Sequence, residues 1–558
     1  MKNNNFRKTV WAGLLVFSFY FLPAMSQAQG VLGGHVTGNM QLDMQMSRED
    51  STIGAPDVPE QLLMNARADI LYTNGAFDAG LRFEAYTNPL LGFDKNYRGQ
   101  GVANYFVSYH NDRISFTAGY FYEQFGNGMI LRTYEDRNIG YDNALFGFNV
   151  HYQLMPGIML KGVIGKQRYC WTLGNGIVRG VDAEVQLNSL IPAWADKDLR
   201  VTLGGGVVSR YEPDTTIFSS PGYKLNLPLN VGAFSTRMDL AYRNWNLNVE
   251  YARKGQDPSF LNNYIYRYGQ ALTVNASYAT RGFSVNLQAK RVDNMVFKSE
   301  RAATDANGAK LYINYIPAIN KEHTYAFLSM YPYSTQAQGE MGLQGDIIWR
   351  LPKDGFLGGT DIHLNSSVIT ALDMKVVGGM GTEGYTSDFF STGDLYYGDA
   401  SLEVTRKINS QLKLTALYGY QVVNPEIDGH SGALHHNNVV VGDLLWKINK
   451  KNALRFEAEW MGSDSRYTQE VDDKRCGDWI MGLVEYNFTS RWFVSVSDQY
   501  AYHDGTGNYY NISLGYTHNA TRIQLGYGKQ REGMICIGGV CRQMPALNGL
   551  TLTLRTSF

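Results

Sequence analysis

The sequence predicts an all-β protein, a single large transmembrane antiparallel β-barrel. The most specific sign is at the carboxy terminus, where Gly549 to Phe558 alternates polar and apolar residues and stops on an aromatic ring. Segments with the same two-residue period recur along the chain. Because successive strand residues point to opposite faces, this pattern predicts strands with one face for lipid and one for water.

The amino terminus predicts export. A basic start is followed by the apolar run Val10 to Leu22 and by small residues, with Ser26 and Ala28 placed for cleavage after Ala28. We expect residues 1–28 to be a signal peptide and residues 29–558 to be the barrel. No later run reaches the roughly 20 consecutive apolar residues that a membrane helix needs. Membrane residence is therefore predicted through strands.

The clearest strands lie near the middle of the chain. In the segment 245–252, Trp245, Leu247, Val249 and Tyr251 alternate with Asn246, Asn248, Glu250 and Ala252. The segments 272–278 and 283–290 repeat the pattern. The apolar sets are predicted to face lipid and the polar sets to face a water-filled lumen.

Short connections alternate with long ones along the chain. Short links such as 243–245 and 518–522 are separated by long segments such as 123–143 and 291–322. Outer-membrane barrels have short periplasmic turns and longer extracellular loops. We therefore expect the short turns and both termini to face the periplasm of a Gram-negative cell, and the long loops to face outside.

The number of strands is predicted to be 24 or 26. Roughly ten residues per strand give about 25 candidates, and two termini on one side require an even number. The stretch 310–333 is either an extra hairpin or an ordered loop. Barrels of 16 to 18 strands already leave an aqueous channel, so wall side chains cannot fill this lumen. Inward-folded loops, a partner protein or open water are the candidates to occupy it.

Composition favours one continuous domain and excludes nucleic-acid binding. No linker rich in Pro, Ser or charge divides the chain, and 38 Tyr and 59 Gly suit aromatic girdles and many turns. The 50 basic and 51 acidic residues give a net charge of −1 and no basic stripe. We expect outer-membrane lipid to be one partner and nucleic acid to be none.

Two runs resemble a known family. They are Glu123 to Arg137 (EQFGNGMILRTYEDR) and Gly538 to Gly549 (GGVCRQMPALNG). Both are similar to sequences of an uncharacterised outer-membrane β-barrel family of the Bacteroidota, a domain of unknown function. The resemblance covers nearly all of the mature chain. It implies a fold and a location but no activity and no functional residue.

The first candidate site is the glycine-rich loop 123–143. Arg132, Glu135, Asp136 and Arg137 mix both charge signs within it. Opposite charges facing each other across a narrow water path set ion preference, so these four residues are a hypothetical pore constriction. The alternative is a surface loop in which these charges pair to hold a turn.

The four cysteines are the second candidate site. Cys536 and Cys541 bracket a short glycine-containing segment and are predicted to form a disulfide in an oxidising compartment. Cys170 and Cys476 are then left to pair across two distant loops, to remain free or to exchange partners. A metal site at Cys536 and Cys541 is not expected, because no further close ligand pair accompanies them.

Two further clusters are weaker candidates for a functional site. His430, His435 and His436 with Asp428 could hold a transition metal, but a solvated loop is the favoured interpretation. The aromatic loop residues Phe260, Tyr264, Tyr266 and Tyr268, with Arg267 among them, either stack on sugars or a partner or form an interfacial girdle, and the girdle is favoured.

These features predict a porin-like passage or receptor for solutes whose loops narrow the lumen. The alternative is a non-conducting scaffold that binds surface lipoproteins, secretion or assembly components, or glycans. No nucleophile elbow, metalloprotease helix or triad is recognisable, so we expect no enzyme activity and no cofactor. A TonB-dependent transporter is disfavoured because alternation begins by about His35, which leaves no amino-terminal plug.

Overall fold

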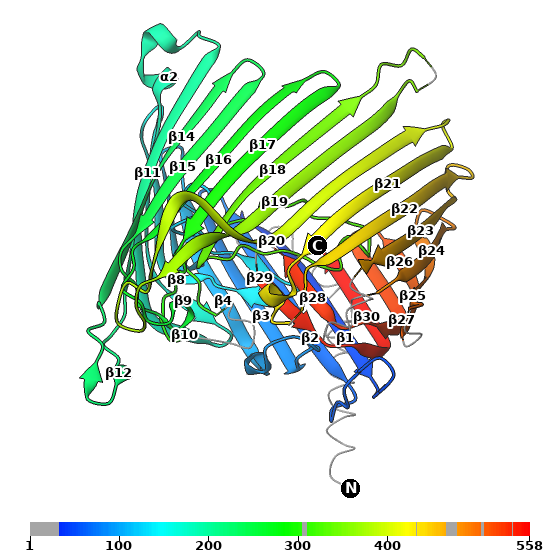
Figure 1. Ribbon diagram of the computed structural model, residues 1–558, viewed down its shortest axis with the longest axis horizontal. Coiled ribbons are helices and arrows are strands. Elements are labelled where there is room, and N and C mark those ends of the chain that lie inside the picture. The colour runs from blue at the N-terminus through cyan, green and yellow to red at the C-terminus, as the bar shows by residue number, and fades with distance from the viewer. Residues whose placement is uncertain are drawn as a thin grey trace.

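The computed structural model describes residues 33–303, 310–355, 357–430, 432–464, 477–503, 507–537 and 540–558. It contains a closed antiparallel barrel of 24 strands, shown in Figure 1. The predicted fold class is confirmed with the lower of the two expected strand counts. The predicted signal peptide, residues 1–28, lies outside the described residues.

The wall strands follow one another in chain order, each paired with its sequence neighbours in the wall. They are β1 (His35–Ser47), β2 (Leu63–Asn74), β3 (Phe77–Asn88), β4 (Gly99–His110), β5 (Ile114–Phe121), β8 (Leu145–Met155), β9 (Ile158–Tyr169), β10 (Thr172–Gln186), β11 (Leu199–Tyr211), β14 (Asn230–Tyr242), β15 (Trp245–Lys254), β16 (Gly269–Thr280), β17 (Phe283–Asp293), β18 (Gly339–Arg350), β19 (Thr360–Val376), β20 (Tyr385–Lys407), β21 (Leu412–Val423), β22 (His435–Lys447), β23 (Ala453–Ser463), β24 (Trp479–Asn487), β25 (Trp492–Ala501), β26 (Gly507–His518), β27 (Thr521–Gln530) and β30 (Leu547–Ser557).

The connections carry only short elements. These are the strand pairs β6 (Glu135–Asp136) and β7 (Tyr141–Asp142), β12 (Phe218–Ser220) and β13 (Tyr223–Lys224), and β28 (Gly533–Ile537) and β29 (Val540–Met544), with the helices η2 (Lys95–Tyr97), α2 (Leu187–Leu190), η3 (Pro192–Trp194), η4 (Phe260–Asn262) and η5 (Pro425–Asp428). Within the described ranges, no helix is long and apolar enough to span a bilayer.

The barrel closes through its terminal strands. β1 pairs with β30 from Asn39 opposite Ser557 to Ser47 opposite Gly549. The alternating carboxy-terminal segment is therefore the last wall strand, as its pattern predicts. A salt bridge of 2.7 Å between Lys529 of β27 and Asp50, in the connection after β1, spans this seam. Closure leaves the wall without an unpaired edge.

Most short turns lie at one end of the barrel and most long connections at the other. We call the end with the short turns the turn rim and the end with the long connections the loop rim. The stretch 310–333 contains no described strand and is an ordered part of the connection between β17 and β18. The predicted long loop from Gln167 to Val178 is instead a tight hairpin, with an irregularity in pairing between Leu173 and Ile177.

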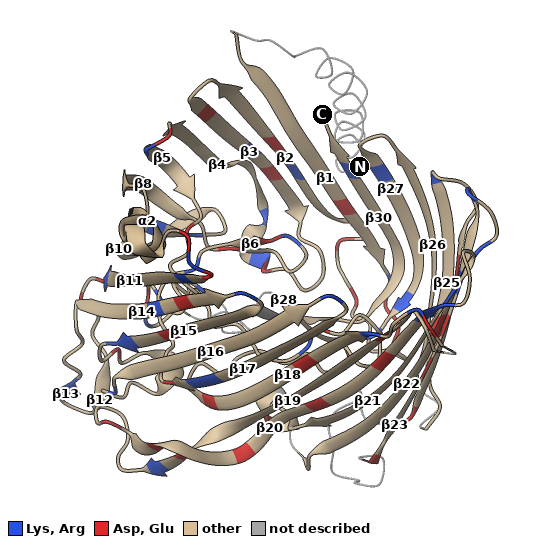
Figure 2. Ribbon diagram, turned by 90° about the horizontal axis from the view of Figure 1, so that it is seen from above, with Lys and Arg blue, Asp and Glu red and all other residues tan. Residues whose placement is uncertain are grey.

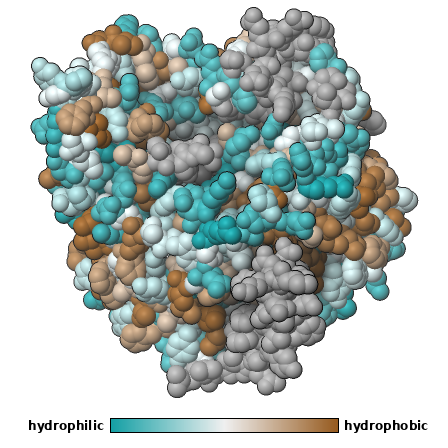
Figure 3. All heavy atoms as spheres, turned by 90° about the horizontal axis from the view of Figure 1, so that it is seen from below, coloured by the Kyte–Doolittle hydropathy of each residue, from teal (hydrophilic) through white to brown (hydrophobic). Residues whose placement is uncertain are grey.

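The outer face of the wall is apolar, as the alternation predicts. Large apolar side chains such as Leu287, at 56% exposure, and Leu343, at 61%, stand on the outer surface. Their strand neighbours Lys290 and Glu340 are buried on the inner side. Seen from the loop rim, hydrophilic residues gather across the middle of the molecule and hydrophobic ones at its flanks (Figure 3). This outward apolar band is the surface that a membrane-spanning barrel presents to lipid.

Replacing an outward side chain with a charged one should cost far more than replacing its inward neighbour. We expect Leu287→Arg to lower the free energy of unfolding by about 2–4 kcal/mol, as measured by denaturant unfolding in lipid vesicles. Asn286→Arg, one residue away but facing the lumen beside Asp346, should change it little. Equal effects of the two substitutions would contradict the assigned faces.

Candidate functional site

Two inward-folded connections fill much of the lumen, and we call them the plug. The first plug segment is residues 122–144, between β5 and β8, and the second is residues 294–338, between β17 and β18, of which 304–309 are outside the described residues. The view from the turn rim shows β6, within the first segment, inside the ring of wall strands (Figure 2). Of the occupants considered for the lumen, inward-folded loops are therefore present.

The plug has an apolar core shared with the wall. Phe125, Met129, Ile130 and Leu131 of the first segment have no exposed surface. They belong to one buried cluster with plug residues Met295, Phe297, Ile313 and Ile316 and with wall residues Leu145, Val163, Val178, Val208, Val231, Ala233, Ala252, Ala271 and Val292. The wall is thus not purely polar on its inner side, because apolar residues replace polar ones where the plug packs.

The second plug segment also packs on the opposite part of the wall. Its residues Tyr325, Phe327, Leu328, Met330 and Tyr331 are buried. They form a second cluster with wall residues of β19 to β25, among them Leu417, Val439, Val441, Met461 and Trp479. The plug therefore bridges two sides of the lumen.

The two plug segments are bonded to each other. The backbone N–H of Arg132 donates to the carbonyl of Ile313 at 2.8 Å, and that of Tyr315 donates to the carbonyl of Gly128 at 3.0 Å. The guanidinium of Arg132 lies over the ring of Tyr134, at 5.0 Å, and over that of Tyr315, at 4.4 Å. Burial raises the pKa of Tyr315 to about 12, so this ring stays neutral beside the cation. Arg132 joins the segments into one body.

Carboxylates of the wall accept hydrogen bonds from the plug. Glu250 accepts the N–H of Asn127 at 2.6 Å. Glu459 accepts the N–H groups of Ala326 and Phe327, both at 2.9 Å. Charged acceptors make stronger hydrogen bonds than neutral ones, so each carboxylate fixes a turn of the plug against the wall.

The contact of Glu250 requires glycine at position 126. Gly126 has φ of +52°, and a Cβ there would lie 2.6 Å from both carboxylate oxygens of Glu250. Only glycine allows both that backbone conformation and that approach. A glycine at this position is thus required for the contact between the loop and the wall.

A second set of contacts holds the plug near its exit into β18. Glu340 accepts the hydroxyl of Tyr333 at 2.5 Å and the N–H of Gln336 at 2.6 Å. Its buried partner Lys290 lies 2.6 Å away and donates to the carbonyl of Pro317 at 2.8 Å. This pair lies between the wall and the plug, and both ions have plug partners.

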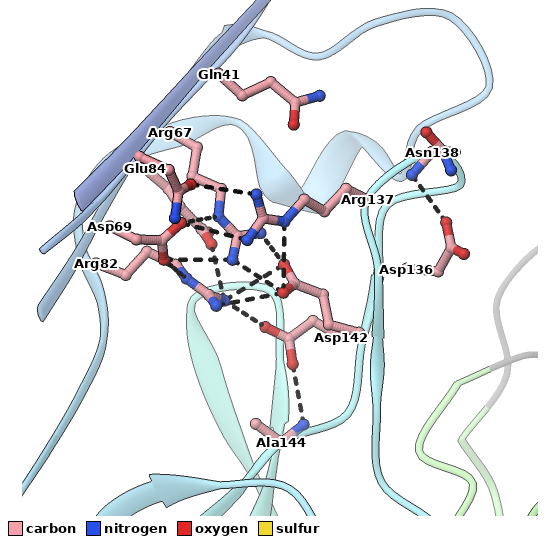
Figure 4. Close-up of polar contacts among 12 residues, drawn as sticks. Gln41, Arg67, Asp69, Arg82, Glu84, Asp136, Arg137, Asn138, Asp142 and Ala144 are labelled. Carbon is pink, nitrogen blue, oxygen red and sulfur yellow. Dashed lines mark hydrogen bonds and ion pairs between the residues drawn. The ribbon is translucent and has the colours of Figure 1, made fainter. Parts of the chain in front are cut away.

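The first plug segment also enters a charged network with β2, β3 and β9, shown in Figure 4. Arg82 lies 2.7 Å from Asp69, 3.3 Å from Glu135 and 3.3 Å from Asp142. Arg168 lies 2.6 Å from Glu84 and 2.5 Å from Asp142. The carboxylates of the plug are therefore shared between arginines of different wall strands.

The four predicted constriction residues separate in the structure. Glu135 joins the network through Arg67, at 2.9 Å, and Arg137 joins it through Asp69, at 3.4 Å. Arg132 lies between the two tyrosine rings instead. Asp136 accepts the N–H of Asn138 at 2.8 Å and so holds the turn between β6 and β7. The role of the four as a constriction stays a prediction.

The wall members of the network could not be singled out from sequence. Arg67, Asp69, Arg82, Glu84 and Arg168 lie at inward positions, but polar inward residues are expected on every strand of a water-filled barrel. The cavity beside the network measures about 40 Å³, enough for water but too small for a solute. The opposite charges thus contact each other directly.

Glu123 holds the start of the plug. It accepts hydrogen bonds from Asn149 at 2.6 Å and pairs with His151 and, at 3.3 Å, with Lys161. Burial alone would raise the pKa of Glu123, but these partners outweigh it and lower the pKa to about 2. The carboxylate is therefore ionised throughout the physiological range.

The cysteine predictions remain open. Cys536 and Cys541 lie opposite each other in the β28–β29 pair, a register consistent with the predicted disulfide. Cys170 is buried at the turn between β9 and β10 and has no disulfide partner among the described residues, and burial raises the pKa of its thiol to about 12. Cys476 lies outside the described residues, so pairing of Cys170 with it stays a prediction.

The histidine cluster does not converge. His435 and His436 are neighbours on β22, where successive side chains point to opposite faces. His435 is buried on the inner side near the ring of Tyr331, whereas His436 is on the outer side, 2.8 Å from the hydroxyl of Tyr420. Among the described residues no group of three His, Cys, Asp or Glu is arranged to hold a metal.

The aromatic loop joins neighbouring connections at the loop rim. The hydroxyl of Tyr266 donates to the carbonyl of Asn226 at 2.7 Å, and Arg267 pairs with Asp293 at 2.8 Å. Phe260 and Tyr268 are 58% and 53% exposed. Tyr266 and Arg267 therefore have structural partners, and Phe260 and Tyr268 are the rings left on the surface.

A comparison with models of known protein families assigns the chain to one of them. Its sequence matches the model of the "Family of unknown function (DUF6029)" over residues 6–558. The chain belongs to this family. No curated protein matches it.

Solved structures resemble the DUF6029 chain only distantly. The P pilus usher (PapC) translocation pore is 8% identical, with 93% of this chain and 99% of that chain covered and a TM-score of 0.43. The ferric enterobactin receptor (PfeA) of Pseudomonas aeruginosa with enterobactin is 10% identical, with 94% and 81% covered and a TM-score of 0.43. OccD3 of Pseudomonas aeruginosa is 12% identical, with 76% and 94% covered and a TM-score of 0.37. Resemblance at this level says nothing about what the DUF6029 chain binds or conducts.

Removing a central arginine of the network should destabilise the DUF6029 barrel strongly. In Arg82→Ala four carboxylates, those of Asp69, Glu84, Glu135 and Asp142, lose a nearly buried partner, so we expect a loss of about 3–5 kcal/mol in the free energy of unfolding. Arg137→Ala is the matched control, because its side chain is 37% exposed and such pairs contribute about 0–1 kcal/mol. Denaturant unfolding of both variants measures the difference, and similar losses would contradict the central position of Arg82.

The low pKa of Glu123 predicts that this carboxylate contributes to the stability of the fold and that the contribution is lost in acid. A carboxylate whose folded pKa lies near 2 stabilises fully above its unfolded value of about 4.3 and loses that contribution as the pH falls toward 2. Between about pH 5 and pH 3, wild-type stability should therefore fall more than that of Glu123→Gln. Parallel denaturant unfolding curves over this range test it, and identical pH profiles would rule it out.

Proposed function

We propose that this protein is a plugged outer-membrane barrel of a Gram-negative bacterium of the Bacteroidota, a passage or receptor for solutes that is closed in the conformation described. The turn rim and both termini face the periplasm, and the loop rim faces outside. The wall of 24 strands encloses a lumen wider than that of a porin of 16 to 18 strands, which already leaves an aqueous channel. The plug then decides what passes.

The observation that carries this proposal is the way the plug is attached. Both of its segments are connections between neighbouring wall strands. Hydrogen bonds join the two ends of the second segment, from Asn294 N–H to Gln338 O at 2.8 Å and from Met295 N–H to Ala337 O at 2.7 Å. The segment can therefore move out of the lumen while β17 and β18 stay paired. A rearrangement of this kind needs no break in the wall.

The plug is also fastened in a way that suits movement. Many of its contacts are hydrogen bonds and ion pairs to wall side chains, and some inner-wall polar atoms beneath it, in Ser401, Gln421 and Asn437, are buried without a protein partner. Buried polar groups of this kind are usually satisfied by water. Hydrated polar places of this kind would separate at lower cost than the dry apolar clusters that the plug also shares with the wall.

A cavity at the plug provides a place where a solute could bind. It measures about 310 Å³ and lies between the second plug segment and the β28–β29 hairpin. Tyr315, Lys321, His323, Tyr333 and Ile535 are among its lining residues. Its size is at the lower end of the range for small-molecule pockets, and its aromatic and polar lining suits a small polar solute or glycan unit.

The alternative function is a non-conducting scaffold for surface lipoproteins, secretion or assembly components, or glycans. The observation that favours it is the β12–β13 hairpin, which projects from the loop rim (Figure 1) and exposes Phe218 by 58% and Tyr223 by 72%. Exposed aromatic side chains are common anchors of protein partners. In that case the plug would be a permanent core.

Conductance in planar bilayers separates the two functions. A variant in which residues 296–336 are replaced by Asn-Gly should insert as a folded barrel and show a large steady conductance, because Met295 and Ala337 already lie at hydrogen-bonding distance. The full-length protein should show a small or intermittent conductance. The matched control replaces the projecting segment 214–224 at the same rim with Asn-Gly and should conduct as the full-length protein does.

A folded barrel that lacks the second plug segment and still does not conduct would contradict a passage closed by that segment and favour the scaffold. Folding is checked by the different gel mobility of heated and unheated samples. If the full-length protein conducts as strongly as the deletion variant, the plug does not close the lumen.

A further inference from the structure

One hairpin leaves the wall and lies on its outside. β19 and β20 have 17 and 23 residues, and their pairing continues beyond both neighbours: β18 reaches Thr370 and β21 reaches Tyr397. We call residues 371–396 the flap. Figures 1 and 2 both show it crossing outside the adjacent strands of the wall at the loop rim.

One side of the flap packs on the outer face of β17 and β18. Asp293 accepts hydrogen bonds from the hydroxyls of Tyr385, at 2.7 Å, and Ser387, at 2.8 Å. The guanidinium of Arg291 lies 4.7 Å from the ring centre of Phe389. Arg291 is on the outer face because Lys290 and Val292, on either side of it, contact the plug. Polar contacts therefore fix the flap at the border of the apolar band that is nearer to the loop rim.

The flap also exposes apolar side chains. Phe390, which points away from the wall, is 86% exposed, and Val376 and Val377, near the end of the flap, are 81% and 59% exposed. The ring of Phe390 lies 5.0 Å from that of Phe389, which covers Arg291. Leu287 and Leu343 stand exposed on the same outer face, below Arg291 and Met341 on their strands. The exposed apolar side chains of the flap therefore adjoin the lipid-facing band of the barrel.

We propose that the flap lies in the lipid surface around the barrel, with Phe390, Val376 and Val377 inserted at the border between headgroups and acyl chains. Aromatic and aliphatic residues mixed with charges are typical of that border. The flap has such a mixture, since Lys375 and Asp388 form an exposed pair at 3.5 Å next to the apolar residues. Lipid would cover side chains that water leaves unfavourably exposed.

This position links the lipid surface to the plug. The hydroxyl of Tyr385 is 2.7 Å from Asp293 and 3.3 Å from the carbonyl of Gln338. These two residues are the last before and the last within the second plug segment. A flap held by lipid therefore holds the two ends of that segment, at Asp293 and Gln338, together.

Photo-crosslinking in the native outer membrane tests the proposal. p-Benzoylphenylalanine replaces Phe390 in one variant and Val376 in a second, and after irradiation the purified protein is analysed by mass spectrometry for lipid adducts. The positive control carries the probe at Leu287, on the outward wall. The negative control carries it at Tyr223, at the tip of the projecting β12–β13 hairpin. Gel mobility before and after heating shows that each variant is folded.

Lipid adducts at 390 and 376, as abundant as at 287 and at least tenfold above 223, are expected. Protein adducts in place of lipid adducts at 390 would assign the surface to a protein partner and overturn the proposal. It is also overturned if the probe at 287 labels lipid while those at 390 and 376 label nothing, or if 223 labels lipid as strongly as 390. None of these outcomes depends on whether the barrel conducts.

Discussion

Closure of the wall through β1 and β30 is the constraint on which the rest of the structure depends. In a bilayer no water can satisfy an open sheet edge, so the last strand has to meet the first. With 24 strands the closed wall surrounds a lumen that its own side chains cannot fill. The plug, its anchors and the charged network all occupy space that this closure creates. The long connections at one rim supply the chain that fills it.

The plug is held by two kinds of interaction that differ in what they specify. Burial of apolar residues such as Phe125 and Phe327 stabilises the plug, but the hydrophobic effect is not directional. The carboxylates of Glu250 and Glu459 and the arginines around Glu135 set where each turn lies. Replacing one partner of such a buried charged pair leaves the other charge uncompensated, which is costly. The polar contacts therefore disfavour any other position of the plug on the wall. Position is thus determined by charge, and compactness by apolar area.

The sequence predicted the wall well because a strand pattern is local. Alternation alone identified the outward set around Leu287 and the inward set around Glu250, and the aromatic end of the chain identified the closing strand. The stretch 310–333 was ambiguous because residues such as Phe327 and Tyr331 are apolar for a non-local reason, since they contact the rings of Trp479 and His435 on distant wall strands. Local periodicity cannot distinguish that from a lipid-facing strand.

The candidate site was predicted less well for a related reason. The mixed charges of 132–137 were visible in sequence, but their partners were not, because Arg67, Arg82 and Arg168 look like any inward residue of a wet barrel. Arg132 shows the limit most clearly. Its charge suggested a water path, yet its neighbours are two tyrosine rings, one of them contributed by Tyr315, 183 residues later in the chain. Only the folded chain brings that ring to it.

The plug and the flap meet at one place, and this determines how a signal could reach the lumen. Asp293 ends β17, receives hydrogen bonds from the flap and pairs with Arg267 of the aromatic loop. Glu340, one residue into β18, holds Tyr333 and Gln336 of the plug from the inner side. The base of the second plug segment is therefore held from outside by the flap and from inside by the wall. A change in either contact alters the same pair of strand ends, so an event at the outer surface can affect the plug without passing through the lumen.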